Sequence, residues 1–88
     1  MSTFELIKLS ELVHSDANIR QKYTEDSVRR MAESIAARGL IQYPVGKRKS
    51  KRRTEIFAGG RRLSALQLLQ AEGRLPASLA DGIPIIVR

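Results

Sequence analysis

The spacing of apolar residues predicts two helices. An amphipathic helix is predicted over Glu25–Arg38, because apolar residues recur there at helical intervals: Val28, Met31 and Ile35. Thr24 suits the N-cap of this helix, and Gly39 suits an αL C-cap. A second helix is predicted over Arg61–Glu72, and Gly73 terminates it. This helix is expected to bury some of its apolar residues: Leu63, Ala65, Leu66, Leu68 and Leu69.

Other segments have the composition of strands. Phe4–Lys8 predicts a short strand, and Leu9–Val13 either continues it or makes one turn. Val45–Lys47 and Thr54–Ala58 predict a hairpin. Ile83–Val87 is almost wholly apolar, which is typical of a strand buried on both faces.

The remaining segments fix the order of the elements. Pro44 cannot donate a hydrogen bond, so Leu40–Val45 predicts an edge strand or a strand that starts near Pro44. Leu75–Gly82 predicts a loop with a helical turn at Ala77–Ala80. The predicted order is β-α-β-β-α-β, which indicates a small α+β domain with a mixed sheet. At 88 residues the chain is expected to form one domain.

Composition excludes several kinds of site. The chain has no cysteine, which excludes disulfides, thiolate metal sites and cysteine catalysis. Its single histidine, His14, falls in a segment expected to be a polar loop, where a surface or capping role is simpler than catalysis. No 18-residue apolar run and no signal peptide appear, so we expect a cytoplasmic protein with no membrane segment.

The positive charge is concentrated in one short run. The formal net charge is +7 and the isoelectric point is about 10.6, which suggests a polyanionic partner. The net charge falls to +1 when six residues are set aside: Lys47, Arg48, Lys49, Lys51, Arg52 and Arg53. This predicted hairpin tip either contacts nucleic acid phosphates or is simply solvated. With no aromatic residue inside the run, such binding would lack sequence specificity.

The segment Ala58–Arg62 is the first candidate site. Two glycines follow a strand, and Arg61 and Arg62 open a helix without a carboxylate before Glu72. Cations at a helix N-terminus are disfavoured by about 0.3–1 kcal/mol each. The arrangement is explained if backbone N–H groups and both guanidinium groups bind one anion. The alternative is a glycine turn into an ordinary helix with solvated arginines; no Walker pattern is present.

Five further residues carry candidate chemistry. Arg20, in the segment Asn18-Ile19-Arg20, can reach the same anion from a polar loop or can be a surface arginine. Gln42 lies in an apolar run and needs a hydrogen-bond partner, either a ligand or the backbone. Three carboxylates could coordinate Mg²⁺, although capping explains the last two more simply: Asp16, Glu25 and Asp26.

Taken in order, these segments resemble the N-terminal domain of ParB-type partition proteins. The resemblance runs from about Ile7 to Val87 and rests on four spaced segments: Asn18–Arg20, Ser34–Gln42, Ile56–Leu66 and Ile83–Val87. It implies a fold shared with sulfiredoxin and a site for CTP with Mg²⁺. It also implies that Arg20, Gln42 and the turn Gly59-Gly60-Arg61-Arg62 line the nucleotide pocket.

The resemblance carries further expectations. It implies DNA as a partner, self-association, a possible ParA-type ATPase partner and a place on the nucleoid or a plasmid. The family's usual acid in the glycine turn is Gly60 here, and its usual third arginine is Ser64, so at most weak CTP hydrolysis is expected. Sulfiredoxin chemistry needs a cysteine, which the chain lacks. The family's Glu-Asn-x-x-Arg motif and helix-turn-helix domain are absent from residues 1–88, which we expect to be one domain of a longer protein.

Three functional hypotheses follow. The first is a nucleotide-responsive, ParB-like N-terminal domain in DNA partition or DNA-associated regulation. The second is a non-specific nucleic-acid-binding module that acts through the basic tip Lys47–Arg53. The third is a nuclease or phosphotransferase, which ranks last because the chain offers no convincing general base.

Overall fold

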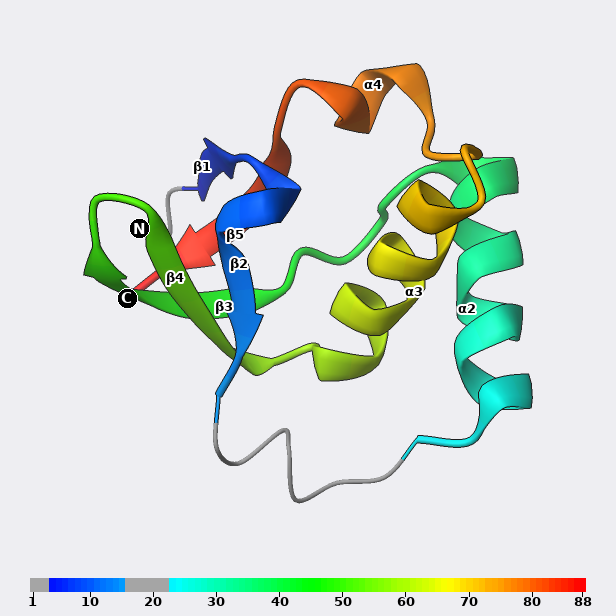
Figure 1. Cartoon of the computed structure of the whole chain (residues 1–88), viewed down its shortest axis with the longest axis horizontal. Helices are drawn as coiled ribbons and strands as arrows, with labels where there is room; N and C mark the ends of the chain where they lie inside the picture. The colour runs from blue at the N-terminus through cyan, green and yellow to red at the C-terminus, as the bar shows by residue number, and fades with distance from the viewer. Residues whose placement is uncertain (1–3, 16–22) are drawn as a thin grey trace.

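The chain folds into a mixed sheet with its two main helices on one side (Figure 1). The computed structural model describes residues 4–15 and 23–88. The strands are β1 Phe4–Ile7, β2 Leu12–His14, β3 Val45–Ser50, β4 Arg53–Ala58 and β5 Ile83–Val87. The helices are η1 Leu9–Glu11, α2 Glu25–Arg38, α3 Gly60–Ala71 and α4 Ala77–Ala80. The predicted α+β class is confirmed, and α2 has the predicted bounds.

The five strands lie in the order β1-β5-β3-β4-β2. β1 is antiparallel to β5 and β3 to β4, whereas β3 runs parallel to β5 and β2 to β4. The two edge strands, β1 and β2, follow one another in the chain with only Lys8 and η1 between them. The edges of a flat sheet of this size would lie about 19 Å apart, which so short a connection with a helical turn cannot span. The sheet is therefore curled.

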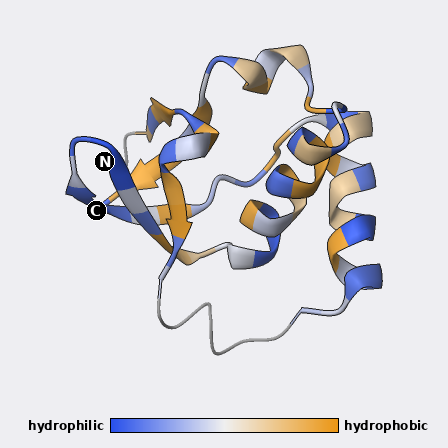
Figure 2. Ribbon diagram, viewed as in Figure 1, coloured by the Kyte–Doolittle hydropathy of each residue, from blue (hydrophilic) through white to orange (hydrophobic). Residues whose placement is uncertain are grey.

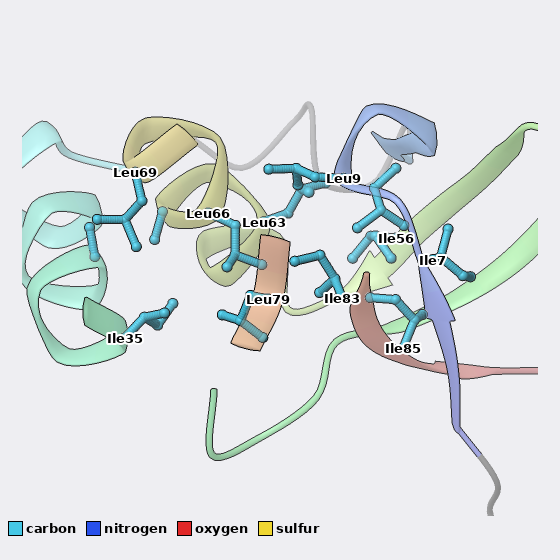
Figure 3. Packing of buried hydrophobic residues seen from close by; sticks show 13 residues of the cluster. Ile7, Leu9, Ile35, Ile56, Leu63, Leu66, Leu69, Leu79, Ile83 and Ile85 are labelled. Carbon is cyan, nitrogen blue, oxygen red and sulfur yellow. The ribbon is translucent and has the colours of Figure 1, made fainter. Parts of the chain in front are cut away.

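Helix α3 lies in the centre of the core. It contacts α2 on one side and strands β2 and β4 on the other. Four of its apolar side chains are fully buried: Leu63, Ala65, Leu66 and Leu69 (Figure 3). From the sheet come Ile7, Leu12, Ile56, Ile83 and Ile85, and from α2 come Ala32 and Ile35. α3 buries a wide apolar side between α2 and the sheet and keeps polar residues such as Gln67 and Gln70 exposed, and α2 likewise shows polar residues on its outer side (Figure 2).

The ends of α2 follow the predicted capping pattern with one difference. The side chain of Thr24 accepts a hydrogen bond from the backbone N–H of Ser27 at 3.1 Å, as expected of an N-cap. Gly39 has a positive φ of 79°, but its ψ of −174° lies outside the αL region. The glycine is still required, because L side chains rarely adopt this φ.

Two strand predictions were wrong. A strand after η1 was not foreseen, so His14 belongs to β2 and not to a polar loop. No local pattern reports this strand, because its partner β4 lies forty residues away in the sequence. The edge position considered for Leu40–Val45 is also wrong, since β3 lies between β5 and β4. The alternative start near Pro44 is correct: Pro44 precedes β3, and its carbonyl accepts a hydrogen bond from the N–H of Ile86 at 2.9 Å.

The basic run lies within strands and not only at a tip. Strands β3 and β4 continue to a turn made by Lys51 and Arg52. Helix α3 starts one residue earlier than predicted, at Gly60, and ends at Ala71. No helix in residues 4–15 and 23–88 has the length and apolarity that a membrane crossing requires.

Candidate functional site

The glycine turn before α3 has a conformation that other residues would strain. Gly59 has φ 93° and ψ 28°, in the left-handed region. A Cβ atom added there would lie 3.1 Å from the Cα atom of Pro44. The turn therefore packs directly on the residue that precedes β3. Gly60, the first residue of α3, is buried, and the first turn of the helix contains no acid.

The two arginines that follow reach opposite ends of α2. Arg61 Nη1 donates to the hydroxyl of Ser27 at 3.0 Å, in the first turn of α2. Arg62 Nη2 donates to Oε1 of Gln42 at 2.6 Å, in the segment that follows α2. Both partners are neutral. Within residues 4–15 and 23–88, neither guanidinium group has a carboxylate within the 4.0 Å of an ion pair.

Each arginine borders a hollow along α2. The hollow beside Arg61 has a volume of about 520 Å³ and the hollow beside Arg62 about 270 Å³. They adjoin, because Met31 and Ser34 line both, and together we call them the α2–α3 groove. The lining residues that we can name are Thr24, Asp26, Ser27, Arg30, Met31, Ser34, Ile35, Gly39, Leu40, Ile41, Gln42, Arg61 and Arg62. Hollows of this size are typical of small-molecule sites.

The groove combines donors for an anion with an apolar end. Arg30, Arg61 and Arg62 supply positive charge, and Asp26 is the single carboxylate among the lining residues named above. Hydroxyl groups lie at the Arg61 end, whereas Ile35, Leu40 and Ile41 lie at the Arg62 end. Such an arrangement can hold a polar, anionic group at one end and a flat or apolar group at the other.

The structure brings some of the predicted anion-site residues together but directs Arg61 toward Ser27 and Arg62 toward Gln42, at opposite ends of α2. Gly59 and Gly60 form the turn, and Gln42 meets Arg62 directly. Arg20 lies outside the described residues, as do Asn18 and Asp16. Sequence reasoning missed the contribution of α2, which supplies Ser27, Arg30 and Ser34. Their spacing of three and four residues places them along one side of a helix, a signal that could have revealed them.

The six basic residues predicted to bind nucleic acid gather on the β3–β4 hairpin, which projects away from α2 (Figure 1). Arg48 pairs with Glu5 at 2.9 Å, and Lys49 and Arg53 lie 4.0 and 3.8 Å from Glu55. The other three form no ion pair with any described acid: Lys47, Lys51 and Arg52. Because Lys49 and Arg53 share Glu55, two carboxylates oppose the six positive charges of the hairpin.

His14 also has a specific neighbour. Its Nε2 atom lies 3.3 Å from the hydroxyl of Ser64, on the second turn of α3. The contact is partly buried. The histidine therefore links β2 to α3, whereas the sequence suggested a surface or capping residue.

Comparison with known families identifies the domain type. Residues 1–88 match the ParB N-terminal domain. This chain belongs to the ParB N-terminal domain family. It is also 35% identical over 81 residues to the uncharacterized protein YubM of Escherichia coli O157:H7. That match covers 91% of this chain but 12% of YubM, so the chain spans a small part of the length of this relative.

Solved structures of low sequence identity share the fold. ParB from Caulobacter crescentus, complexed with CTP-γ-S, aligns with a TM-score of 0.73 and 23% identity over 97% of this chain and 43% of that one. The same protein bound to the centromeric parS site aligns with a TM-score of 0.71 and 22% identity, over 96% of this chain and 40% of that one. Sulfiredoxin from Arabidopsis thaliana aligns with a TM-score of 0.69 and 20% identity, over 97% of this chain and 83% of that one. The predicted family and its fold shared with sulfiredoxin are thus confirmed.

The residues of this ParB N-terminal domain suit an anion better than a bare metal ion. No group of three or more acids or histidines that could hold a metal occurs among the residues that the structure describes. Mg²⁺ usually keeps several waters and binds proteins through one or two carboxylates together with substrate phosphates. Among the described lining residues of the groove, Asp26 is the one carboxylate that could meet that lesser requirement.

Proposed function

We propose that this domain is a nucleotide-responsive module of a ParB-like protein in DNA partition or DNA-associated regulation. The observation that carries the proposal is the pair Arg61 and Arg62. Both lie at the N-terminus of α3, where the helix dipole opposes them, and both are held by neutral acceptors instead of carboxylates. An anion would satisfy these charges, and the family makes CTP with Mg²⁺ the first candidate.

The groove suggests how a nucleoside triphosphate would be held. The phosphates would bind at the first backbone N–H groups of α3, and Arg61 and Arg62 would turn toward them from their present partners Ser27 and Gln42. Arg20 would approach from the preceding segment, and Gln42 would exchange its bond to Arg62 for one to the ligand. Mg²⁺ would reach the site with the phosphates and neutralise part of their charge.

Binding and not hydrolysis is the proposed role. The turn carries Gly60 where an acid could position water, and Asp26 is the one carboxylate among the lining residues named above. Hydrolysis without a positioned base is slow. Occupancy of the groove would instead bias self-association, because the ligand would draw α2, the segment after it and α3 together. Residues 1–88 would be one domain of a longer, cytoplasmic protein on the nucleoid or a plasmid, with DNA and a ParA-type ATPase as partners.

Calorimetry tests the nucleotide site. CTP, ATP and GTP are titrated with Mg²⁺ into the wild-type chain, Arg61→Ala and the control Arg52→Ala. The control removes the same charge from the β3–β4 turn, outside the groove. We expect wild type and Arg52→Ala to bind CTP alike and Arg61→Ala to bind at least about tenfold more weakly, since charged hydrogen bonds contribute about 1.5–3 kcal/mol. Failure of all three nucleotides to bind, or equal loss in both variants, would refute the assignment.

The β3–β4 hairpin supports a second candidate, non-specific nucleic-acid binding through the basic run Lys47–Arg53. Lys51 and Arg52 form its exposed turn and have no acidic partner among the described residues. Charge reversal of both residues should abolish duplex DNA binding and leave CTP binding intact. If duplex binding persists, the hairpin is not the DNA element.

A further inference from the structure

The sheet face turned away from α3 carries a row of apolar side chains. In β4, Thr54 and Ile56 are fully buried, so the alternation of side chains directs Phe57 to the opposite face. Phe4 is directed there too, because Ile7 of the same strand is buried. Strand register aligns Phe4 with Ile86 and Ile86 with Val45; Val45 then pairs with Ala58, next to Phe57, where the β3–β4 register is irregular.

The aromatic members of this row are open to solvent. Phe4 is 53% exposed and Phe57 44%, and Leu6, on the same face of β1, is 68% exposed. The ring of Tyr43 supports Phe4 edge-on, with centroids 5.2 Å apart. A contact of this kind restricts the ring of Phe4, which remains exposed enough to meet another planar group.

Positive charge borders the row on one side. Lys47 follows Val45 by two residues and so points to the same face, as does Lys49. Arg88 lies beside β3, since its N–H donates to the carbonyl of Gly46 at 2.9 Å. Glu55 is the only acid within β3 and β4, and Lys49 and Arg53 pair with it. Lys47 has no acidic partner among the ion pairs of the described residues.

We infer that this sheet face binds single-stranded nucleic acid. Bases stack on the exposed rings of Phe4 and Phe57, while phosphates lie along Lys47 and Arg88. Exposed rings flanked by cations are the general means of binding single strands, and stacking requires bases that are not already paired within a duplex. A second copy of this chain is a poorer occupant, because the same cations would face one another.

The inference goes beyond the nucleotide groove, which lies on the other side of the sheet. It shares Lys47 and Lys49 with the alternative function of the hairpin but adds the aromatic rings and the preference for single strands. The basic run itself contains no aromatic residue. The sheet supplies the rings from β1 and from the end of β4, which the sequence order does not reveal.

Fluorescence anisotropy tests the inference with labelled dT20 and a 20-base-pair duplex at the same low salt concentration. We expect tighter binding of dT20 than of the duplex. Phe57→Ala and Phe4→Ala should each weaken dT20 binding roughly fivefold or more. Lys47→Gln should reduce the salt slope by about 0.7, the value for one phosphate contact on a single strand.

Leu6→Ala is the matched control. It removes an exposed apolar side chain from the same face without removing a ring, so dT20 binding should change less than twofold. Circular dichroism confirms that each variant is folded. The inference is overturned if the duplex binds as well as dT20 and the phenylalanine variants bind normally, a result that still supports the hairpin. Absence of binding, or an apolar row buried by self-association in sedimentation, overturns it too.

Discussion

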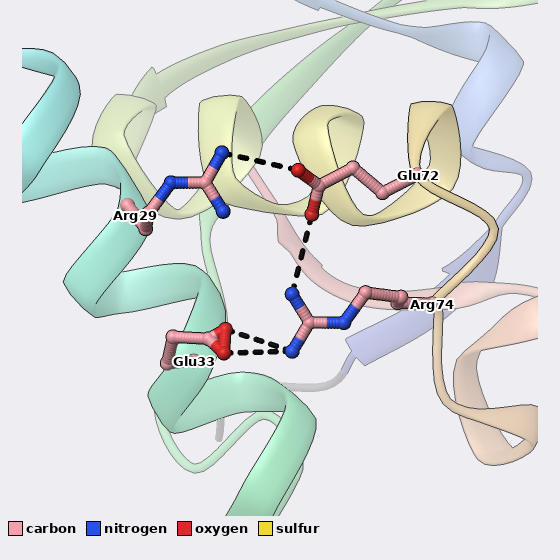
Figure 4. A network of polar contacts seen from close by, with 4 residues as sticks. All are labelled: Arg29, Glu33, Glu72 and Arg74. Atoms are coloured by element: carbon pink, nitrogen blue, oxygen red, sulfur yellow. Dashed lines mark hydrogen bonds and ion pairs between the residues drawn. The ribbon is translucent and has the colours of Figure 1, made fainter.

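The arginines at the two ends of α3 have different partners, although both ends of the helix lie against α2. At the C-terminal end, Arg29 pairs with Glu72 at 3.0 Å, and Arg74 pairs with Glu72 at 3.3 Å and Glu33 at 2.7 Å (Figure 4). At the N-terminal end, Arg61 and Arg62 are held by a hydroxyl and an amide. Arginines at the C-terminal end are therefore paired with acids, whereas the groove arginines Arg30, Arg61 and Arg62 form no ion pair with any described acid.

The ion pairs at the C-terminal end of α3 also shift the pKa values of their members. The hydrogen bond from Arg74 lowers the pKa of Glu33, and that from Arg29 lowers the pKa of Glu72. Glu33 in turn raises the pKa of Arg74. Ion pairs this exposed contribute little to stability, so the network mainly sets how α2 and α3 meet. Arg61 and Arg62 also join α3 to its neighbours, but through neutral partners that leave their charge unpaired among the described residues, which is why they favour an anionic ligand.

The largest expected effect on stability comes from a change in the buried middle of α3, which holds both ends of the helix in place. Leu66 lies in the middle of α3 and is fully buried. Leu66→Ala should lower the free energy of unfolding by about 2–5 kcal/mol, as buried leucines do. Urea denaturation measures this. A loss below 1 kcal/mol would mean that α3 is not the central layer of the core.

Gly59→Ala should disturb the groove end alone. Left-handed backbone costs a non-glycine residue about 1–3 kcal/mol, and the added Cβ would lie 3.1 Å from the Cα of Pro44. Gly73 is the control, because it also has a positive φ, of 69°, but its Cβ would meet nothing within 4 Å. Urea denaturation should show Gly59→Ala as the less stable variant. Equal losses would show that packing on Pro44 is unimportant.

Removing an arginine should have opposite effects at the two ends. Arg61→Ala should leave stability unchanged or raise it by up to about 1 kcal/mol, because a cation at a helix N-terminus is unfavourable. Arg74→Ala should lower the thermal midpoint, because it leaves Glu33 without its partner. Calorimetric melting at neutral pH measures both. A loss of stability in Arg61→Ala would indicate a structural arginine and weaken the case for an anion.

The smallest effect concerns pH. A carboxyl group with a lowered pKa stabilises the fold above its ordinary value of 4.5, and this stability is lost as pH falls through the lowered pKa. The difference in melting temperature between wild type and Arg74→Ala should therefore be full at neutral pH, decline as the pH falls below about 4.5 and vanish below the lowered pKa of Glu33. The difference for Arg61→Ala should not follow this profile. A difference for Arg74→Ala that persists at low pH would refute the network.

The sequence allowed much of this to be predicted where the signal is local. Helix α2 has a capping residue, a regular apolar stripe and a terminal glycine within sixteen residues, and its bounds were predicted correctly. Strand β2 has three residues and a partner far along the chain, so no local pattern marks it. The bond between Arg62 and Gln42 depends on tertiary packing, although both residues could be singled out by their unusual neighbours.

The central claim is that the α3 N-terminus is an anion site and the α3 C-terminus is not. Thermal unfolding with and without pyrophosphate tests it in three proteins: wild type, Arg61→Ala/Arg62→Ala and Arg29→Ala/Arg74→Ala. A ligand at 100 times its Kd stabilises the folded state by about 2.7 kcal/mol. The account predicts a raised Tm in wild type and in Arg29→Ala/Arg74→Ala, and none in Arg61→Ala/Arg62→Ala. An equal rise in all three proteins, or no rise in wild type, would contradict it.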